Sequence, residues 1–238
     1  MSGHSKWAQI KRKKEATDKK RGKLITQFAK IIAMAAREGG DPAHNAKLAL
    51  AIARAKSFNI PSDTIERAIE RGSGAKEGEG FSEITYEAYG PGGSAFVVQT
   101  ITDNKNRTVS DLKHILSLHG GKMAQSGGVS WMFEDRGVVE VVLADATKAE
   151  EAEMLAIEND ALDVSMEGTN VFVETRVPDL QKMEKAFTNA GYEVSDSHID
   201  KVAKDTIPLP QDASEQFNAL YEALESNDDV QGVFTNVA

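Results

Sequence analysis

The 238-residue chain contains no cysteine. This absence excludes a disulfide framework, a thiolate metal site and a cysteine nucleophile. It fits a reducing compartment better than a secreted scaffold, so we expect a cytoplasmic location. No segment approaches the roughly 20 consecutive apolar residues that span a bilayer, and no apolar stretch of a signal peptide follows the N-terminus. We therefore expect no membrane partner.

Catalytic and metal-binding spacings are also missing. The five histidines form no metal pattern, since His114 and His119, the nearest pair, lie about 140° apart around a helix. No Walker A, G-x-S-x-G, H-E-x-x-H or EF-hand motif occurs. Carboxylates such as Glu150, Glu151 and Glu153 follow solvated helix faces. The sequence predicts a non-enzyme with no catalytic residues, cofactor, metal or small-molecule substrate.

Positive charge is scarce in most of the chain but concentrated at its start. The net charge is -9 overall, yet residues 1–76 hold 17 basic and 7 acidic side chains. The remaining residues hold 11 basic and 30 acidic side chains. Such asymmetry indicates that one end of the protein meets a polyanion, for which nucleic acid is the leading candidate.

The N-terminal piece reads as a basic arm over residues 1–15 followed by three helices. Apolar residues at helical spacing run from Leu24 to Ala35 and end before Gly39. Asp41 with Pro42 predicts the start of a second helix, and Asp63 with Glu66 predicts a capping box for a third. A glycine-rich linker follows the third helix.

Strand patterns dominate the rest of the chain. Strands are predicted over residues 84–88, 95–102 and 129–133, with a helix over 108–118 between the second and third. Residues 138–199 then follow the order β-α-β-β-α-β of a ferredoxin-like sandwich. A helix over 213–224 and a strand over 232–236 are left to complete the earlier sheet, although sequential strands could also pair locally.

The predicted fold is therefore α+β, with a helical domain followed by two α/β sandwich domains. The helical domain with its arm spans residues 1–76. A discontinuous central domain comprises residues 77–135 and 206–238, and a ferredoxin-like domain of residues 136–205 is inserted into it.

The basic arm is the main candidate for nucleic-acid binding. Its cations attract phosphates through counterion release, and Trp7 among them is suited to stacking on an exposed base. A solvated arm, with Trp7 packed against the helices, is the alternative. The candidate contact residues are His4, Ser5, Lys6, Trp7, Lys11, Arg12, Lys13, Lys14, Lys19, Lys20, Arg21 and Lys23.

Two loops are weaker candidates for contact with a partner. Tyr89, Gly90, Pro91 and Gly92 form a glycine-rich connection between strands, for which a simple turn is the favoured reading. Asn106 or Thr108 is expected to cap the following helix, while Lys105 and Arg107 project toward a phosphate or a partner.

Four stretches of the chain resemble the YebC/PmpR family of gene-expression regulators. They are Gly3 to Trp7, Tyr86 to Gly93, Thr102 to Thr108, and Gly127 to Val129 with Trp131 and Phe133. The resemblance implies three domains and a cytoplasmic, non-enzymatic protein. Family members are described as DNA-binding transcriptional regulators and as ribosome-associated factors that help translation through proline-rich stretches, and a mitochondrial relative is a translational activator.

Three functions remain open at the level of sequence. The arm could bind promoter DNA, or it could bind ribosomal RNA and the ribosome. The absence of a helix with clustered base-reading side chains favours structured RNA. A protein-interaction adaptor whose arm binds an acidic partner is the third alternative.

Overall fold

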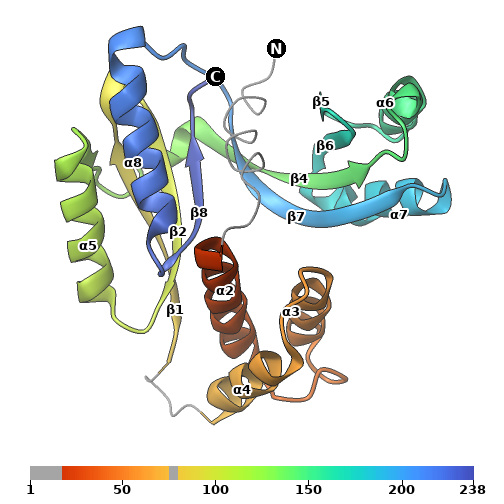
Figure 1. Cartoon of the computed structure of the whole chain (residues 1–238), viewed down its shortest axis with the longest axis horizontal. Helices are drawn as coiled ribbons and strands as arrows, with labels where there is room; N and C mark the ends of the chain where they lie inside the picture. Colours follow the sequence, from red (N-terminus) through yellow and green to blue (C-terminus); the bar gives the residue numbers. More distant parts are fainter. Residues whose placement is uncertain (1–17, 75–79) are drawn as a thin grey trace. The chain divides into compact units, whose positions relative to one another are not determined.

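The computed structural model describes residues 18–74 and 80–238, in which seven α-helices accompany two four-stranded sheets (Figure 1). These residues pack as two compact units. One unit holds Ser130–Leu209 and Phe234–Ala238, and the other holds the described residues up to Val129 together with Pro210–Val233. The predicted α+β fold is confirmed. The three domain boundaries stay a prediction, as does the arm over residues 1–15, which lies outside the described residues.

Three helices form the start of the described chain, as predicted: α2 (Asp18–Ala36), α3 (Ala46–Ser57) and α4 (Ser62–Ser73). Their apolar faces meet in one core, because the 3.6-residue period brings every third or fourth side chain to the same side. This core contains Phe28, Ile32, Leu48, Ala55 and Ile65.

The predicted starts of α3 and α4 were wrong. The Asn45 side chain, not Asp41, caps α3 by accepting a hydrogen bond from the Leu48 amide at 3.0 Å. The side-chain amide nitrogen of Asn45 also donates to the carbonyl oxygens of Ala35 and Gly39 at the end of α2. These tertiary bonds explain why Asn45 is the capping residue. Asp63 makes no capping bond, because α4 already begins at Ser62; its carboxylate instead pairs with Arg67.

The first sheet, sheet A, combines strands from distant parts of the chain. It has the order β3-β1-β2-β8, with β1 (Ser82–Tyr89), β2 (Ala95–Thr102), β3 (Lys122–Met123) and β8 (Val230–Thr235). Helices α5 (Lys105–Leu118) and α8 (Ser214–Ser226) accompany it and bury Leu112, Leu116, Phe217 and Leu220 (Figure 1). The C-terminal strand therefore completes this sheet, which confirms the inserted topology.

A strand predicted over residues 129–133 is not present. Ser130–Met132 form a short 3-10 turn (η2), and Lys122–Met123 supply the edge strand instead. The amides of Gly127 and Val129 donate to the two Glu87 carboxylate oxygens, each at 2.7 Å. The Glu87 side chain therefore accepts the backbone hydrogen bonds that a neighbouring strand would otherwise have accepted.

The second sheet, sheet B, has the predicted ferredoxin-like arrangement. Strands β4 (Phe133–Val142), β5 (Asp163–Glu167), β6 (Asn170–Arg176) and β7 (Glu193–Ala203) pair antiparallel in the order β5-β6-β4-β7. Helices α6 (Ala149–Glu158) and α7 (Leu180–Asn189) cover the face that carries Val139, Val141, Val171 and Val173.

Further 3-10 turns occur between strands β1 and β2 (η1, Pro91–Gly93) and before α6, α7 and α8 (η3, Ala146–Lys148; η4, Val177–Asp179; η5, Gln211–Ala213). Within the described ranges, no helix combines the length and the apolar character needed to cross a membrane.

Candidate nucleic-acid interface

The structure describes the part of the predicted interface that lies in α2. His4, Ser5, Lys6, Trp7, Lys11, Arg12, Lys13 and Lys14 lie outside the described residues. Lys19, Lys20, Arg21 and Lys23 lie in the first two turns of α2, where Arg21 is exposed. These four cations are the part of the predicted interface that the structure describes.

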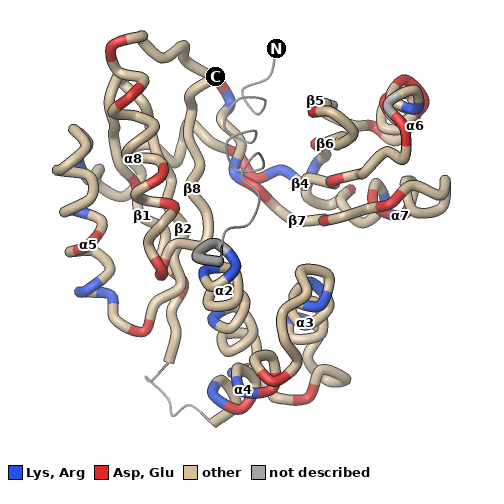
Figure 2. The backbone as a smooth tube through the Cα atoms, viewed as in Figure 1, with Lys and Arg blue, Asp and Glu red and all other residues tan. Residues whose placement is uncertain are grey.

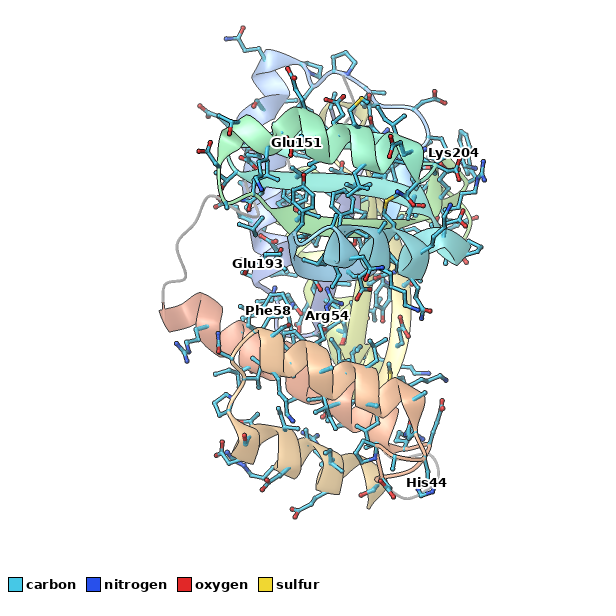
Figure 3. The ribbon with its side chains drawn as sticks, turned by 90° about the vertical axis from the view of Figure 1, so that its right-hand side faces the viewer. His44, Arg54, Phe58, Glu151, Glu193 and Lys204 are labelled. Carbon is cyan, nitrogen blue, oxygen red and sulfur yellow. The ribbon has the colours of Figure 1, made fainter. Side chains whose placement is uncertain are left out.

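The described helices continue this positive character. Residues 18–74 contain eleven lysines and arginines against six acids, and basic positions follow α2, α3 and α4 (Figure 2). Arg54 lies near the end of α3 and Phe58 is at its C-cap (Figure 3). The ring centroids of Phe58 and Phe28 are 5.2 Å apart. Part of this charge is paired locally, since Lys47 binds Glu38 at 2.6 Å and Arg67 binds Asp63.

A buried ionic cluster attaches α2 to sheet A. The Lys30 ammonium lies 2.6 Å from the Asp229 carboxylate and donates to the Asp228 carbonyl at 2.7 Å. The side chains of Lys30 and Asp229 are only 11% and 6% exposed, respectively. The Gln27 amide donates to the Val230 carbonyl at 2.7 Å in the same region. These bonds attach α2, which carries the described cations of the predicted interface, to sheet A.

Asp229 gathers several donors around one carboxylate. Thr108 donates to it at 2.7 Å, and Arg107 binds it at 3.1 Å. Burial by itself would raise the pKa of Asp229, but hydrogen bonds from Lys30, Thr108 and Arg107 outweigh that effect and lower the pKa to about 2. The Asp229 carboxylate therefore stays charged at neutral pH.

The predicted loop before α5 has a different local arrangement from the expected one. Asn104, rather than Asn106 or Thr108, caps the helix by accepting from the Arg107 amide at 3.1 Å. Thr108 is buried, and its hydroxyl donates to the Asp229 carboxylate at 2.7 Å. The Arg107 guanidinium is half exposed and bound to both Asp229 and Asp103, so much of its charge is committed within the protein.

Lys105 lines a polar groove of about 540 Å³ at the N-terminus of α5. Arg37, which directly follows α2, lines the same groove as Lys105. The sequence analysis did not identify Arg37 as a contact residue. Ser82, Thr102, Asp103 and Asn104 supply further polar lining. Sequence spacing gave no signal for this pairing, since Arg37 and Lys105 lie on different elements.

The Tyr89–Gly92 loop forms a tight connection between β1 and β2. The Gly90 amide donates to the Ser94 carbonyl at 2.8 Å, and Pro91 is buried. A Cβ atom at Gly90 would lie 2.4 Å from the Phe96 ring, so close packing alone explains the glycine. Its role as a partner surface stays a prediction.

Sequence reasoning missed a charged cluster on β7. The ligand atoms of Glu140, Asp196 and His198 all lie within 4.8 Å of one another. His198 Nδ1 lies 3.1 Å from Asp196, and Nε2 lies 3.4 Å from Asp200. Alternation of Asp196, His198 and Asp200 along one strand was the signal that could have revealed the cluster.

His198 is the cation at the centre of this cluster. Burial disfavours its charged form, but the carboxylates of Asp196 and Asp200 outweigh burial and raise the pKa of His198 to about 9. A metal requires a neutral imidazole, so at neutral pH the arrangement is better described as an ion-pair centre.

Comparison with known proteins places this architecture among proteins of matching length. Residues 5–75 match the TACO1/YebC protein N-terminal domain, and residues 81–237 match the TACO1/YebC second and third domain. A probable transcriptional regulatory protein of Caldanaerobacter subterraneus subsp. tengcongensis is 45% identical, over 100% of this chain and 98% of the relative. A protein of the same description from Chlorobium phaeovibrioides is 46% identical, over 100% and 95%.

A solved structure agrees with the fold. The crystal structure of a conserved hypothetical protein from Aquifex aeolicus has a TM-score of 0.88 and 38% identity, and the match covers 98% of this chain and 97% of that one. A helical module, an interrupted α/β sheet and a ferredoxin-like insertion, with relatives named as regulators, define a class of multidomain α+β regulatory proteins. The chain belongs to the TACO1/YebC family.

Proposed function

We propose that this protein is a non-catalytic regulator of gene expression that binds nucleic acid through its basic arm and the first turns of α2. The segregation of charge carries this proposal: residues 1–76 hold 17 basic and 7 acidic side chains, whereas the remainder is strongly acidic. Basic segments bind phosphate backbones by releasing counterions, without a need for base-specific contacts.

The two sheets are assigned a different role. Their acidic surfaces repel a polyanion, so they would orient the basic end or contact protein. The groove with Lys105 and Arg37 is a place where a sheet-A element adds a cation to those of the N-terminal helices. It would accept a phosphate beside these two cations at the N-terminus of α5, where the helix dipole also favours an anion.

The described helices favour structured RNA as the target. Base-reading helices present free arginine, asparagine or glutamine side chains on one face. On α4, however, Arg67 is paired with Asp63, and Arg71 lies 4.4 Å from the Phe81 ring centroid and 3.3 Å from Asp103. The relatives are named as probable transcriptional regulatory proteins, and regulation of transcription would favour DNA as the target instead.

Binding measured across salt tests the proposal. Fluorescence anisotropy with a labelled DNA duplex and a ribosomal RNA hairpin should show affinity falling with salt, at a log–log slope of about -5 if roughly six phosphates are neutralised. Ribosome co-sedimentation, with and without residues 1–17, separates the two targets. Loss of sedimentation on truncation supports ribosomal RNA, whereas sequence-specific protection of DNA alone supports a promoter. Absence of binding to either at physiological salt would leave the adaptor function.

A further inference from the structure

Sheet B has one edge strand that lacks the usual protection against pairing with another chain. Strand β5 lies at this edge, and among the described residues only β6 pairs with it (Figure 1). Natural edge strands are commonly blocked by a lysine, a proline or a β-bulge. The other edge strand, β7, has a register shift against β4 and carries Lys201, whereas β5 contains no lysine, proline, glycine or register shift. The outer backbone groups of β5 can therefore pair with a further strand.

The two faces of β5 have opposite chemistry. Val164 pairs with Val173 of the unit's core, so Val164 and Met166 lie on the face that the helices cover. Asp163 and Glu167 alternate with them and lie on the opposite face, and neither forms an ion pair within the described residues. A strand added beside β5 would meet apolar side chains on one face and carboxylates on the other.

Exposed apolar side chains extend this edge onto α6, which packs against β5 and β6. Met154 and Ile157 lie three positions apart on the outer side of α6 and are 60% and 61% exposed. Leu162 and Met166 are each 44% exposed. Of the nine large apolar side chains that the described residues expose, four thus come from residues 154–166. Such a concentration is typical of a surface that binds protein.

The charges that accompany these apolar side chains in the sequence are all negative. Residues 149–168 hold no lysine, arginine or histidine and seven acids, which are Glu150, Glu151, Glu153, Glu158, Asp160, Asp163 and Glu167. Lys182 from α7 pairs with one of them, Asp160, at 3.1 Å. A partner for this edge must therefore be cationic as well as apolar, since electrostatic complementarity selects partners of opposite charge.

A second copy of the chain does not meet this requirement. If β5 paired with itself in the fully overlapping antiparallel register, centred on Ser165, Asp163 of each copy would lie opposite Glu167 of the other. Like charges directly opposite each other destabilise a strand pair. The acids of β5 thus oppose self-association and admit a basic strand.

We propose that β5 and the outer side of α6 form a docking site for an extended, basic segment of a partner protein, which adds to sheet B as a fifth strand. Such a segment alternates apolar side chains, which cover Leu162 and Met166, with lysine or arginine, which face Asp163 and Glu167. Backbone hydrogen bonds to β5 contribute affinity, and the alternation of side chains gives specificity. This contact goes beyond the proposed function and does not rest on nucleic-acid binding.

A synthetic peptide tests strand addition to the full-length protein. The probe is the labelled, end-capped peptide Lys-Val-Lys-Val-Lys-Val-Lys, and its reference has proline in place of the central valine. Proline keeps the charge but removes a backbone donor. Fluorescence anisotropy at about 0.1 M salt should show the probe binding at least tenfold more tightly than the reference. Equal affinity for the two peptides would show ionic attraction without strand pairing and would overturn the proposal.

Hydrogen exchange locates the bound probe. Saturation with the probe should slow exchange of the amides in residues 162–167 several-fold, because a new strand protects the outward groups of β5. Protection confined to β7, or to any surface other than β5, would refute docking at this edge. If the protein alone dimerises at micromolar concentration and protects the same amides, the occupant is a second copy and the proposal fails.

A matched pair of substitutions tests the apolar contact. Met166→Lys should weaken probe binding at least tenfold, because it removes apolar area and places a like charge at the edge. Leu118→Lys makes the same change at an exposed position of α5 and should alter affinity less than twofold. Equal losses in these two variants would contradict a contact at β5.

A second matched pair tests the charges without altering the apolar side chains. Asp163→Asn with Glu167→Gln should weaken probe binding about tenfold at low salt and reduce its dependence on salt. Asp212→Asn with Glu215→Gln removes the same charge from exposed positions at the start of α8 and should change affinity less than twofold. Equal effects of the two double variants would indicate a general charge effect and would sink the assignment to β5.

Discussion

Asp229 is the residue on which the attachment of α2 to sheet A depends. It lies in the turn before β8, yet its carboxylate meets Lys30 from α2, and Arg107 and Thr108 from α5. Its pKa in the folded protein, about 2, is below the unfolded value of 3.8, so its contribution to stability is present above pH 4 and is lost as the pH falls from about 4 to 2. That contribution is about 2 kcal/mol.

A double-mutant cycle measures this attachment. Asp229→Asn or Lys30→Met alone should cost about 3–5 kcal/mol, because each leaves a buried charge without its main partner. The double variant should cost less than the sum by about 1–3 kcal/mol. Urea unfolding at neutral pH gives these free energies. The exposed pair Lys47–Glu38, also 2.6 Å apart, is the control and should couple by under about 1 kcal/mol. Additive costs at Lys30 and Asp229 would show that the pair does not act as a unit.

At the scale of elements, Gly72 explains how α2 and α4 approach each other. A Cβ atom at this position would lie 2.1 Å from the Ala33 carbonyl oxygen and 2.8 Å from the Ala36 Cβ. Both of these neighbours belong to α2, so the glycine in α4 permits backbone contact between the two helices. Glycine is otherwise unfavourable inside a helix, which indicates that packing decides this position.

Two alanine substitutions with opposite expected signs test this interpretation. Gly72→Ala should destabilise the helical module by about 1–3 kcal/mol, because overpacking outweighs the gain in helix propensity. Gly22→Ala in α2 has nothing within 4 Å of the added carbon and should stabilise by about 0.5–1 kcal/mol. Thermal unfolding followed by far-ultraviolet circular dichroism compares them. A stabilising Gly72→Ala would contradict the close approach.

Periodicity predicted the elements well where a single buried face organises them. The α2 stripe, β2 and the ferredoxin-like order were all confirmed. Predictions failed at element ends, where remote groups choose between equivalent local residues. Asn45 caps α3 because its amide also reaches α2, and Glu87 takes the amides near Val129. Neither the role of Asn45 nor that of Glu87 can be recognised from the spacing of neighbouring residues.

At the scale of the whole molecule, positive and negative side chains are separated along the chain. The basic residues at the start and the acidic residues elsewhere are evident from the sequence alone. Salt screens the attraction between these cations and a polyanion, so binding through them should weaken as the salt concentration rises.

Neutralising the arm tests its share of binding. Replacing Lys11, Arg12, Lys13 and Lys14 by glutamine should weaken nucleic-acid binding at least tenfold at low salt and reduce the magnitude of the salt slope by up to about 4. The unfolding temperature should not change. Glutamine at Lys148, Lys182, Lys185 and Lys204, which are exposed on the unit that holds sheet B, is the matched control. Affinity equal in the two variants would show that the arm does not bind.

The sequence by itself determined the class of fold, the order of the elements and the location of the positive charge, because periodicity and composition are local properties. It also predicted the arm residues, but not Arg37 beside Lys105, the Lys30–Asp229 pair or the cluster around His198. Only the tertiary structure decided these, since they join side chains that are far apart in the chain or that face each other across strands. Burial then set their energetics: the low pKa of Asp229 and the high pKa of His198 both arise from partners that folding brings within hydrogen-bonding distance.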